Sequence, residues 1–199
     1  SVASRGLGDV YKRQILNKKY NVIGVFTQPP RPSGRGMKEI KSSIQQYSEK
    51  NKLNFYTPNN LKNDEILKLL KSLNPDLIVV VAYGLLIPEV ILKIPSYGCI
   101  NGHASLLPKW RGAAPIQRAI EAGDIKTGCT SMLMEKGLDT GPMIHKKEIL
   151  IKMENDVIDL FKSLSLLTAE CINETIQKLI SGDSKQTPQN NLEASYAHK

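Results

Sequence analysis

The sequence has few cysteines and histidines, and their scarcity excludes several kinds of site. Its three cysteines, Cys99, Cys129 and Cys171, show neither a Cys-x-x-Cys pair nor another metal-ligand spacing. The histidines also number three, and no cluster of cysteine and histidine predicts a bound metal. An odd count of unpatterned cysteines is typical of reduced thiols. We therefore expect a chain without disulfides or metal, located in the cytoplasm (the bacterial cytosol, or an organelle matrix in a eukaryote).

Long apolar runs are missing as well. The longest lies between Asp76 and Glu89 and is interrupted by Tyr83-Gly84 and Pro88. It is shorter than the roughly 18 residues that a membrane span needs. The sequence also shows no secretory pattern of charged start, apolar middle and cleavage site. We therefore expect no membrane partner.

What is present fits one globular domain with a basic surface. A chain of 199 residues can bury a sizeable core, and 41% hydrophobic with 23% charged residues is ordinary for such a domain. The net charge of +8 and the pI of about 9.3 fit a polyanionic partner. On its own, a positive net charge is weak evidence for such a partner, so the function has to be inferred from the motifs.

Three segments are expected along the chain. Residues 1–14, SVASRGLGDVYKRQ, resemble the translation of a sequencing adapter, and we expect a non-native artefact there; a genuine polar segment is the alternative. Residues 15–182 carry the hydrophobic periodicity of a folded domain. Residues 183–199 are polar and are expected to form a linker.

The periodicity predicts strands that alternate with helices. Strands are expected at 21–27, 52–56, 76–82, 98–101, 127–135 and 142–151, and helices at 39–50, 61–73, 88–92, 114–122 and from a cap at Asn155 to Gly182. The last two strands should pair antiparallel. The Pro- and Gly-rich segment 28–38 should be an exposed loop rather than an element.

This alternation predicts the fold class. We expect an α/β fold with an open, Rossmann-like, mostly parallel sheet and helices on both faces. The β-branched run DLIVVVA at 76–82 should be a central strand buried on both faces. Ligands of such sheets bind beyond the carboxyl ends of the strands.

Asn101 and His103 lie at one of these strand ends. Strand side chains alternate, so the two point to the same side. An amide NH₂ and an imidazolium could stabilise an oxyanion at a carbonyl, and a histidine can move a proton near neutral pH. Asp139, in the turn GLDTG, could hold the imidazole. Taken singly, a structural histidine and a turn-capping aspartate are the simpler interpretations.

The motifs around these residues resemble the folate-dependent formyltransferases. INGHASLLPKWRGAAPIQRAI followed by GDIKTGCTSMLMEKGLDTGPMI carries that family's Asn-x-His, Ser-Leu-Leu-Pro and aspartate. FTQPPRPSGRGMK and LNPDLIVVVAYGLLIP bring the resemblance closer to members that act on methionyl-tRNA. It extends from about Ile15 to Lys199.

The resemblance implies a reaction and residues for it. A formyl group would pass from 10-formyltetrahydrofolate to the α-amino group of methionine on initiator methionyl-tRNA, for translation initiation. Asn101, His103 and Asp139 would be catalytic, and no metal is implied. The residues implied to contact the folate are Tyr83, Gly84, Leu85, Leu86, Ser105, Leu106, Leu107 and Pro108. By residue type alone, both of those loops could be plain strand-end turns.

The resemblance also implies partners. Arg31, Arg35 and Lys38 would contact the tRNA acceptor stem, whereas a solvated basic loop is the interpretation without it. We expect a monomer. A formyltransferase acting on a small amine (glycinamide ribonucleotide or an amino sugar) and a catalytically silent tRNA-binding module are the alternatives.

Several features depart from the family pattern. The family's first strand should precede Ile15, and its C-terminal β-barrel domain should follow residue 199, so we expect a fragment that is incomplete at both ends. Pro30 and Gly102 replace residues usual in the family, and Gly102 should loosen its strand.

Overall fold

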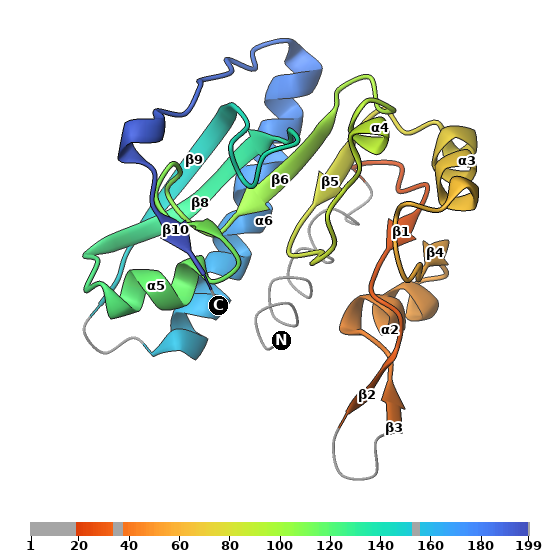
Figure 1. The fold of residues 1–199 in the computed structure, drawn as a ribbon, viewed down its shortest axis with the longest axis horizontal. Helices are drawn as coiled ribbons and strands as arrows, with labels where there is room; N and C mark the ends of the chain where they lie inside the picture. Colours follow the sequence, from red (N-terminus) through yellow and green to blue (C-terminus); the bar gives the residue numbers. More distant parts are fainter. Residues whose placement is uncertain (1–18, 34–37, 153–155, 199) are drawn as a thin grey trace.

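The computed structural model describes residues 19–33, 38–152 and 156–198, and its centre is a four-stranded sheet (Figure 1). The strands of this sheet are β5 (Ile78–Val80), β6 (Cys99–His103), β8 (Lys126–Leu133) and β9 (Met143–Leu150), in that spatial order. β5 and β6 pair parallel, whereas β6, β8 and β9 pair antiparallel. The α/β class is confirmed, with a sheet that is mixed rather than mostly parallel in the described residues.

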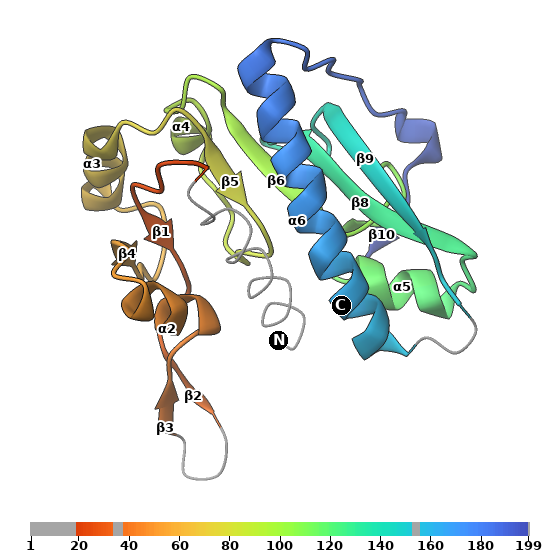
Figure 2. The same ribbon diagram turned by 180° about the vertical axis from the view of Figure 1, so that it is seen from behind.

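The long helix α6 (Val157–Ser181) covers one face of this sheet (Figure 2). The apolar residues on its inner side, among them Leu164 and Ile172, are buried in the core clusters. A Cβ atom on Gly102 of β6 would lie 2.6 Å from Ile172 Cδ1 and 2.8 Å from Thr168 Cγ2. Glycine at position 102 therefore lets the helix lie close to the strand, and we find no loosening of β6 there.

The other face of the sheet carries the short strands β7 (Arg111–Gly112) and β10 (Tyr196–Ala197), which pair parallel. They were missed in the sequence because two residues give no periodicity. Helix α5 (Pro115–Glu121) follows β7, and the 3₁₀ turn η1 (Asn191–Glu193) precedes β10. Residues 183–198, predicted as a linker, thus run along the domain and pair with it.

The first part of the chain forms smaller units. β1 (Val25–Phe26) pairs parallel with β4 (Phe55–Tyr56), and helices α2 (Ser43–Lys50), α3 (Asp64–Leu73) and α4 (Glu89–Leu92) complete it. β2 (Arg31–Ser33) and β3 (Lys38–Ile40) form an antiparallel hairpin that projects from the body in Figure 1. The prediction of a loop without elements at 28–38 was therefore wrong at residues 31–33 and 38, while residues 34–37 lie outside the described residues.

Other boundaries differ from the prediction for local reasons. Helix α2 begins at Ser43 because the Ser42 hydroxyl accepts from the Gln45 N–H, so residues 39 and 40 remain in β3. Asp156 caps α6, while Asn155, the predicted cap, lies outside the described residues. The strand predicted at 76–82 is ordered as β5 over three residues that are only half-buried, not buried on both faces.

Candidate active site

Strand β6 carries the two polar residues of the predicted site. Asn101 lies opposite Val80 of β5 and Met132 of β8, and His103 lies opposite Thr130 of β8. With one residue between them, both side chains point to the same side of the sheet. The His103 side chain is buried, and Asn101 is half-buried. The strand therefore presents an amide and an imidazole side by side at its carboxyl end.

Asp139 joins them from the turn between β8 and β9. Its Oδ1 accepts from Asn101 Nδ2 at 3.2 Å, and its Oδ2 accepts from the Gly112 N–H at 2.9 Å. The same Oδ2 lies 3.6 Å from His103 Nδ1. Asp139 has a φ of 52°, a left-handed conformation that aspartate tolerates better than most residues. The three predicted residues thus converge from one strand, β6, and one turn.

The orientation of the His103 ring is fixed from its other nitrogen. Nε2 lies 2.7 Å from the Trp110 carbonyl oxygen. A carbonyl only accepts, so Nε2 carries the proton. Nδ1 is left facing Asp139 at a separation longer than a hydrogen bond. Nδ1 is therefore the nitrogen available to exchange a proton, with a carboxylate beside it.

The Ser-Leu-Leu-Pro segment after β6 is held mostly from inside the protein. Ser105 and Leu107 are fully buried. The Thr130 hydroxyl donates to the Ser105 carbonyl at 2.7 Å and accepts from the Leu107 N–H at 3.0 Å. Lys146 of β9 donates to the Leu107 carbonyl, and burial lowers the pKa of this lysine while Glu193 opposes that effect. Ser105 and Leu107 are thus placed as supports of the segment.

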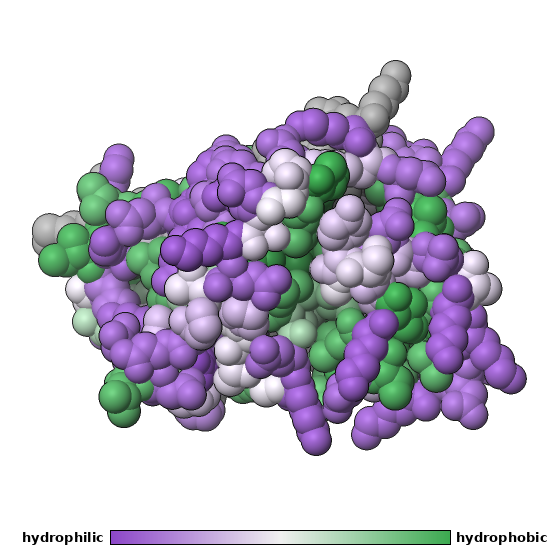
Figure 3. Space-filling view, turned by 90° about the horizontal axis from the view of Figure 1, so that it is seen from above, coloured by the Kyte–Doolittle hydropathy of each residue, from purple (hydrophilic) through white to green (hydrophobic). Residues whose placement is uncertain are grey.

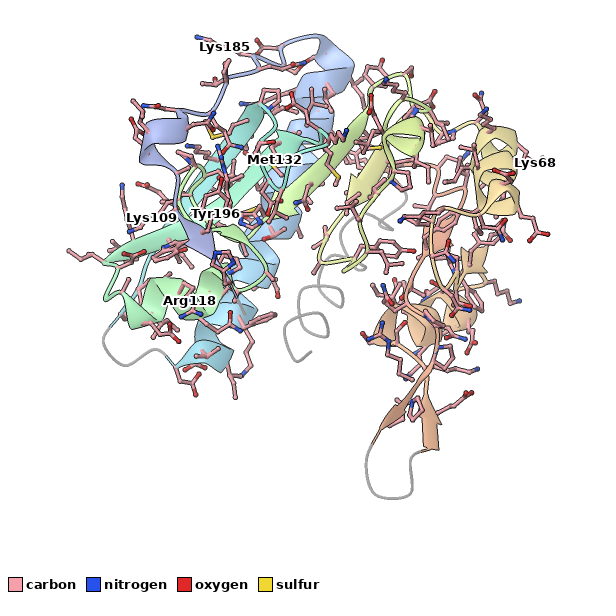
Figure 4. The ribbon with its side chains drawn as sticks, in the orientation of Figure 1. Lys68, Lys109, Arg118, Met132, Lys185 and Tyr196 are labelled. Atoms are coloured by element: carbon pink, nitrogen blue, oxygen red, sulfur yellow. The ribbon has the colours of Figure 1, made fainter. Side chains whose placement is uncertain are left out.

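Leu106 is the residue of that segment that faces a hollow. It lines a cavity of about 620 Å³ together with Lys109, Trp110 and residues 123–127. Lys109 Nζ and Trp110 Nε1 bind the two carboxylate oxygens of Asp124, at 2.6 and 2.8 Å. None of Asn101, His103 and Asp139 lines this cavity. Figure 4 shows Lys109 at the side of the sheet, near β10.

The loop at 81–88 contains the other residues implied to contact a folate. Tyr83 and Leu85 pack on the core cluster of Leu61, Leu70 and Ile91, whereas Leu86 is 76% exposed. The Tyr83 carbonyl accepts from Gln28 Nε2 at 2.9 Å. Gly84 has a φ of 80°, which favours glycine.

The hydroxyl of Tyr83 is the unusual feature of this loop. Its oxygen is buried and has no hydrogen-bond partner among the described residues, and burial raises the pKa of the hydroxyl. A buried polar atom without a partner is uncommon in a folded protein. The Tyr83 hydroxyl could therefore form a hydrogen bond with a polar group of a bound molecule.

The basic residues of the segment 28–38 are separated by the structure. Arg31 lies exposed on β2, where its guanidinium donates to Gln28 Oε1 at 2.8 Å. Lys38 lies on β3, and Arg35 lies outside the described residues. This hairpin is distant from the polar residues of β6 along the molecule (Figure 1).

Sequence reasoning missed the backbone groups that complete the site. The Trp110 carbonyl and the Gly112 N–H hold His103 and Asp139, and both come from the stretch that forms β7. Gly112 has a φ of 114°, and a Cβ atom there would lie 3.0 Å from the Ala197 carbonyl oxygen. The glycine of the Trp-Arg-Gly sequence was the one available signal, because glycine readily adopts a positive φ.

The comparisons with known proteins point to one family. A family model described as formyl transferase matches residues 3–176. The chain is 44% identical over 187 residues to the methionyl-tRNA formyltransferase of Idiomarina loihiensis, and 46% identical to that of Marinobacter nauticus. These alignments cover 94% of the chain but 59% and 60% of the two relatives. The chain thus spans about three fifths of their length.

Solved structures share the fold at lower identity. The phosphoribosylglycinamide formyltransferase of Anaplasma phagocytophilum superposes with a TM-score of 0.76 at 17% identity, covering 94% of this chain and 91% of that one. The N-formyltransferase of Helicobacter canadensis, solved with folinic acid and dTDP-3-aminofucose, gives 0.66 at 20% identity, covering 97% and 68%. These likenesses concern the fold. None of the helices that the structure describes is long and apolar enough to cross a membrane. With the family model matched over most of its length, the chain belongs to the formyl transferase family.

Proposed function

We propose that this chain is the catalytic part of an enzyme that transfers a formyl group from 10-formyltetrahydrofolate to the α-amino group of methionine on initiator methionyl-tRNA. The observation that carries the proposal is the convergence of Asn101, His103 and Asp139, through the Asn101–Asp139 hydrogen bond and the facing of His103 Nδ1 to Asp139 Oδ2. The relatives at 44–46% identity bear the name of that activity.

The chain's residues have distinct tasks in such a transfer. The methionine amine attacks the formyl carbon of the donor, and negative charge develops on the formyl oxygen. When this intermediate collapses, the bond from the formyl carbon to N10 of the folate breaks, and N10 leaves with a proton as the amine loses one. One Asn101 N–H is engaged by Asp139, which leaves the second to donate to that oxygen. His103 in its charged form adds a second stabilising group. Both groups stand on a strand, so little reorganisation is needed.

Asp139 serves the proton balance. Its carboxylate faces His103 Nδ1 at 3.6 Å, and it can take the proton of the attacking amine through a water molecule. The Gly112 N–H donates to Oδ2 of this carboxylate, and Oδ1 accepts from the Asn101 amide. Two of the carboxylate's hydrogen bonds thus come from groups that do not titrate near pH 7.

The folate would bind between the 81–88 loop and the Ser-Leu-Leu-Pro segment. The unpartnered Tyr83 hydroxyl and the exposed Leu86 support this placement, because a pterin presents both an apolar face and polar edges. The hairpin of β2 and β3, with exposed Arg31, would meet tRNA phosphates.

A transfer assay tests the proposal. With radiolabelled 10-formyltetrahydrofolate, the protein should formylate charged initiator tRNA and leave glycinamide ribonucleotide and amino sugars unlabelled. His103→Ala should slow the labelling of tRNA by about 100- to 1,000-fold, while Glu148→Gln on β9 should leave it unchanged. Label on a small amine instead of tRNA would assign the small-amine reaction, and tRNA binding without transfer would leave a binding module.

A further inference from the structure

The polar segment 187–198 contacts two parts of the candidate active site, the stretch 108–114 and the turn that carries Asp139. Ser195 donates from its backbone to the Pro108 carbonyl and accepts at its hydroxyl from the Trp110 N–H, at 3.3 and 3.0 Å. The Ala197 carbonyl accepts from the N–H groups of Ala113 and Ala114. The residues after 186 thus hold the stretch whose backbone binds His103 and Asp139.

Gln189 contacts the Asp139 turn directly. Its Nε2 donates to the carbonyls of Asp139 and Gly141, at 2.9 and 2.8 Å. Its Oε1 accepts from Arg111 Nε at 3.0 Å. An arginine can only donate and a carbonyl can only accept, so this network leaves one orientation for the amide. Three hydrogen bonds therefore fix one side chain.

Arg111 makes the other end of this connection. Its side chain is 2% exposed, and its Nη2 donates to Asn191 Oδ1 at 3.0 Å. The arginine precedes Gly112, whose N–H holds Asp139 Oδ2. Gln189 thus connects the Asp139 backbone to the Arg111 side chain. The next residue, Gly112, holds the Asp139 carboxylate through its N–H.

The Asp139 turn needs such a restraint. A left-handed φ of 52° at a non-glycine residue costs free energy and persists only where its surroundings hold it. The carboxylate must stay near His103 Nδ1 and Asn101 Nδ2 to act on both. A displacement of about 1 Å at a reacting group can cost roughly 100-fold in rate.

We propose that Gln189 is a positioning residue, which holds the Asp139 turn in its active geometry through the two hydrogen bonds that its amide donates. The proposal rests on the proposed function for its meaning in catalysis, and on the contacts of Gln189 for its geometry. Segment 187–198 is then part of the active site's support.

Gln189→Glu separates this role from a purely structural one. The variant keeps an acceptor for Arg111 but loses both donors to the turn. We expect kcat for formyl transfer to fall roughly 10- to 100-fold with little change in KM. Gln46→Glu is the matched control, because it makes the same substitution on the exposed side of α2, where Gln46 Nε2 donates to the Lys41 carbonyl; its kcat should stay near that of the unmodified protein.

A second readout does not depend on the reaction. The Gly112 amide proton, bonded to Asp139 Oδ2, should resonate at a lower frequency in Gln189→Glu as that bond lengthens, and should keep its position in Gln46→Glu. If the unmodified protein transfers no formyl group, the proposed function fails while this resonance still reports on the positioning. Should Gln189→Glu not fold, Gln189→Met, which has a similar shape and no donor, takes its place. Unchanged kcat and an unchanged Gly112 resonance in the donor-free variant would overturn the proposal.

Discussion

Two regions of this molecule, residues 19–97 and residues 98–198, are held together differently. In the first, each strand has two or three residues, and one small cluster around Leu61, Leu70 and Ile91 forms its core. In the second, strands of five and eight residues pack under a 25-residue helix. Asn101, His103 and Asp139 all belong to the second region, so exact side-chain geometry coincides with dense packing.

The surface differs less than the interior. In the view from above, hydrophilic side chains cover much of the face, and hydrophobic ones appear between them (Figure 3). Among the described residues, exposed apolar side chains occur in both regions, with Leu86 in the first and Leu138 in the second. The contrast between the regions therefore concerns what is buried, and variants can test it.

The largest effect should come from removing a group of the site. We expect His103→Ala to lower kcat/KM for formyl transfer by about 100- to 1,000-fold, as for the loss of one oxyanion-stabilising group. Steady-state kinetics at saturating formyl donor measures this, with Glu148→Gln of β9 as the control. A rate near that of the unmodified protein would remove His103 from the reaction.

Core truncations should separate the regions next. Leu164 of α6 is fully buried, whereas Leu67 of α3 is half-buried. Leu164→Ala should lower the free energy of unfolding by about 2–5 kcal/mol through lost burial and a cavity. Leu67→Ala should cost about half as much or less, because part of its side chain already meets water. Urea unfolding of both variants measures the difference, and equal losses would contradict the contrast.

The same small substitution in each region gives a finer comparison. Gly102→Ala would place a methyl group 2.6 Å from Ile172 Cδ1 and should destabilise by about 1–3 kcal/mol. At Gly24 the nearest atom, Tyr56 Cε2, would lie 3.2 Å away. There the Tyr56 ring can shift, and the lower conformational entropy of the unfolded chain offsets the cost of that shift. The free energy of unfolding of Gly24→Ala should therefore change by no more than about 0.5 kcal/mol. A larger loss at Gly24 than at Gly102, by thermal melting, would reverse the account.

A pH effect should be the smallest. Lys147 donates to Glu174 at 2.8 Å and is the main cause of a lowered pKa for that carboxyl; burial opposes it and His145 adds to it. The charged form is favoured in the folded state, so this stability is present above the unfolded pKa of about 4.3 and is lost as pH falls through the folded value.

The size of that effect is limited by solvent. The Glu174 side chain is 41% exposed, so the contribution should be below about 1 kcal/mol. Glu174→Gln should make the free energy of unfolding fall less steeply between about pH 5 and pH 3, which is roughly the range in which carboxyl groups titrate. An unchanged slope would mean that the contact with Lys147 is fully screened.

The sequence predicted the parts of the fold that have a period. The antiparallel strands β8 and β9 on either side of GLDTG, the long apolar pattern of α6, and the Asn-x-His at the end of β6 all appear as expected. Strands of two residues have no period, so β7 and β10 were invisible. The hairpin at Arg31 was hidden by prolines and glycines, which signal turns more strongly than strands.

The sequence named the side chains that the structure brings together in the candidate site, but not the backbone groups around them. Side-chain chemistry is read from residue types, so Asn101, His103 and Asp139 could be named in advance. The roles of the Trp110 carbonyl and the Gly112 N–H depend on where the chain passes, which residue types do not tell. Gln189 escaped because its polar surroundings resemble a linker and its partners lie far away in the sequence.

One kinetic titration tests the central claim. It holds that residues 98–198 carry the chemistry, whereas the hairpin of β2 and β3, within residues 19–97, binds the tRNA. Formyl transfer is measured against initiator methionyl-tRNA concentration for Asp139→Asn and Arg31→Ala, with Glu148→Gln as control. The account predicts that Asp139→Asn lowers kcat at little-changed KM, whereas Arg31→Ala raises KM for the tRNA at little-changed kcat. The reverse split, or a normal kcat for Asp139→Asn, would contradict it.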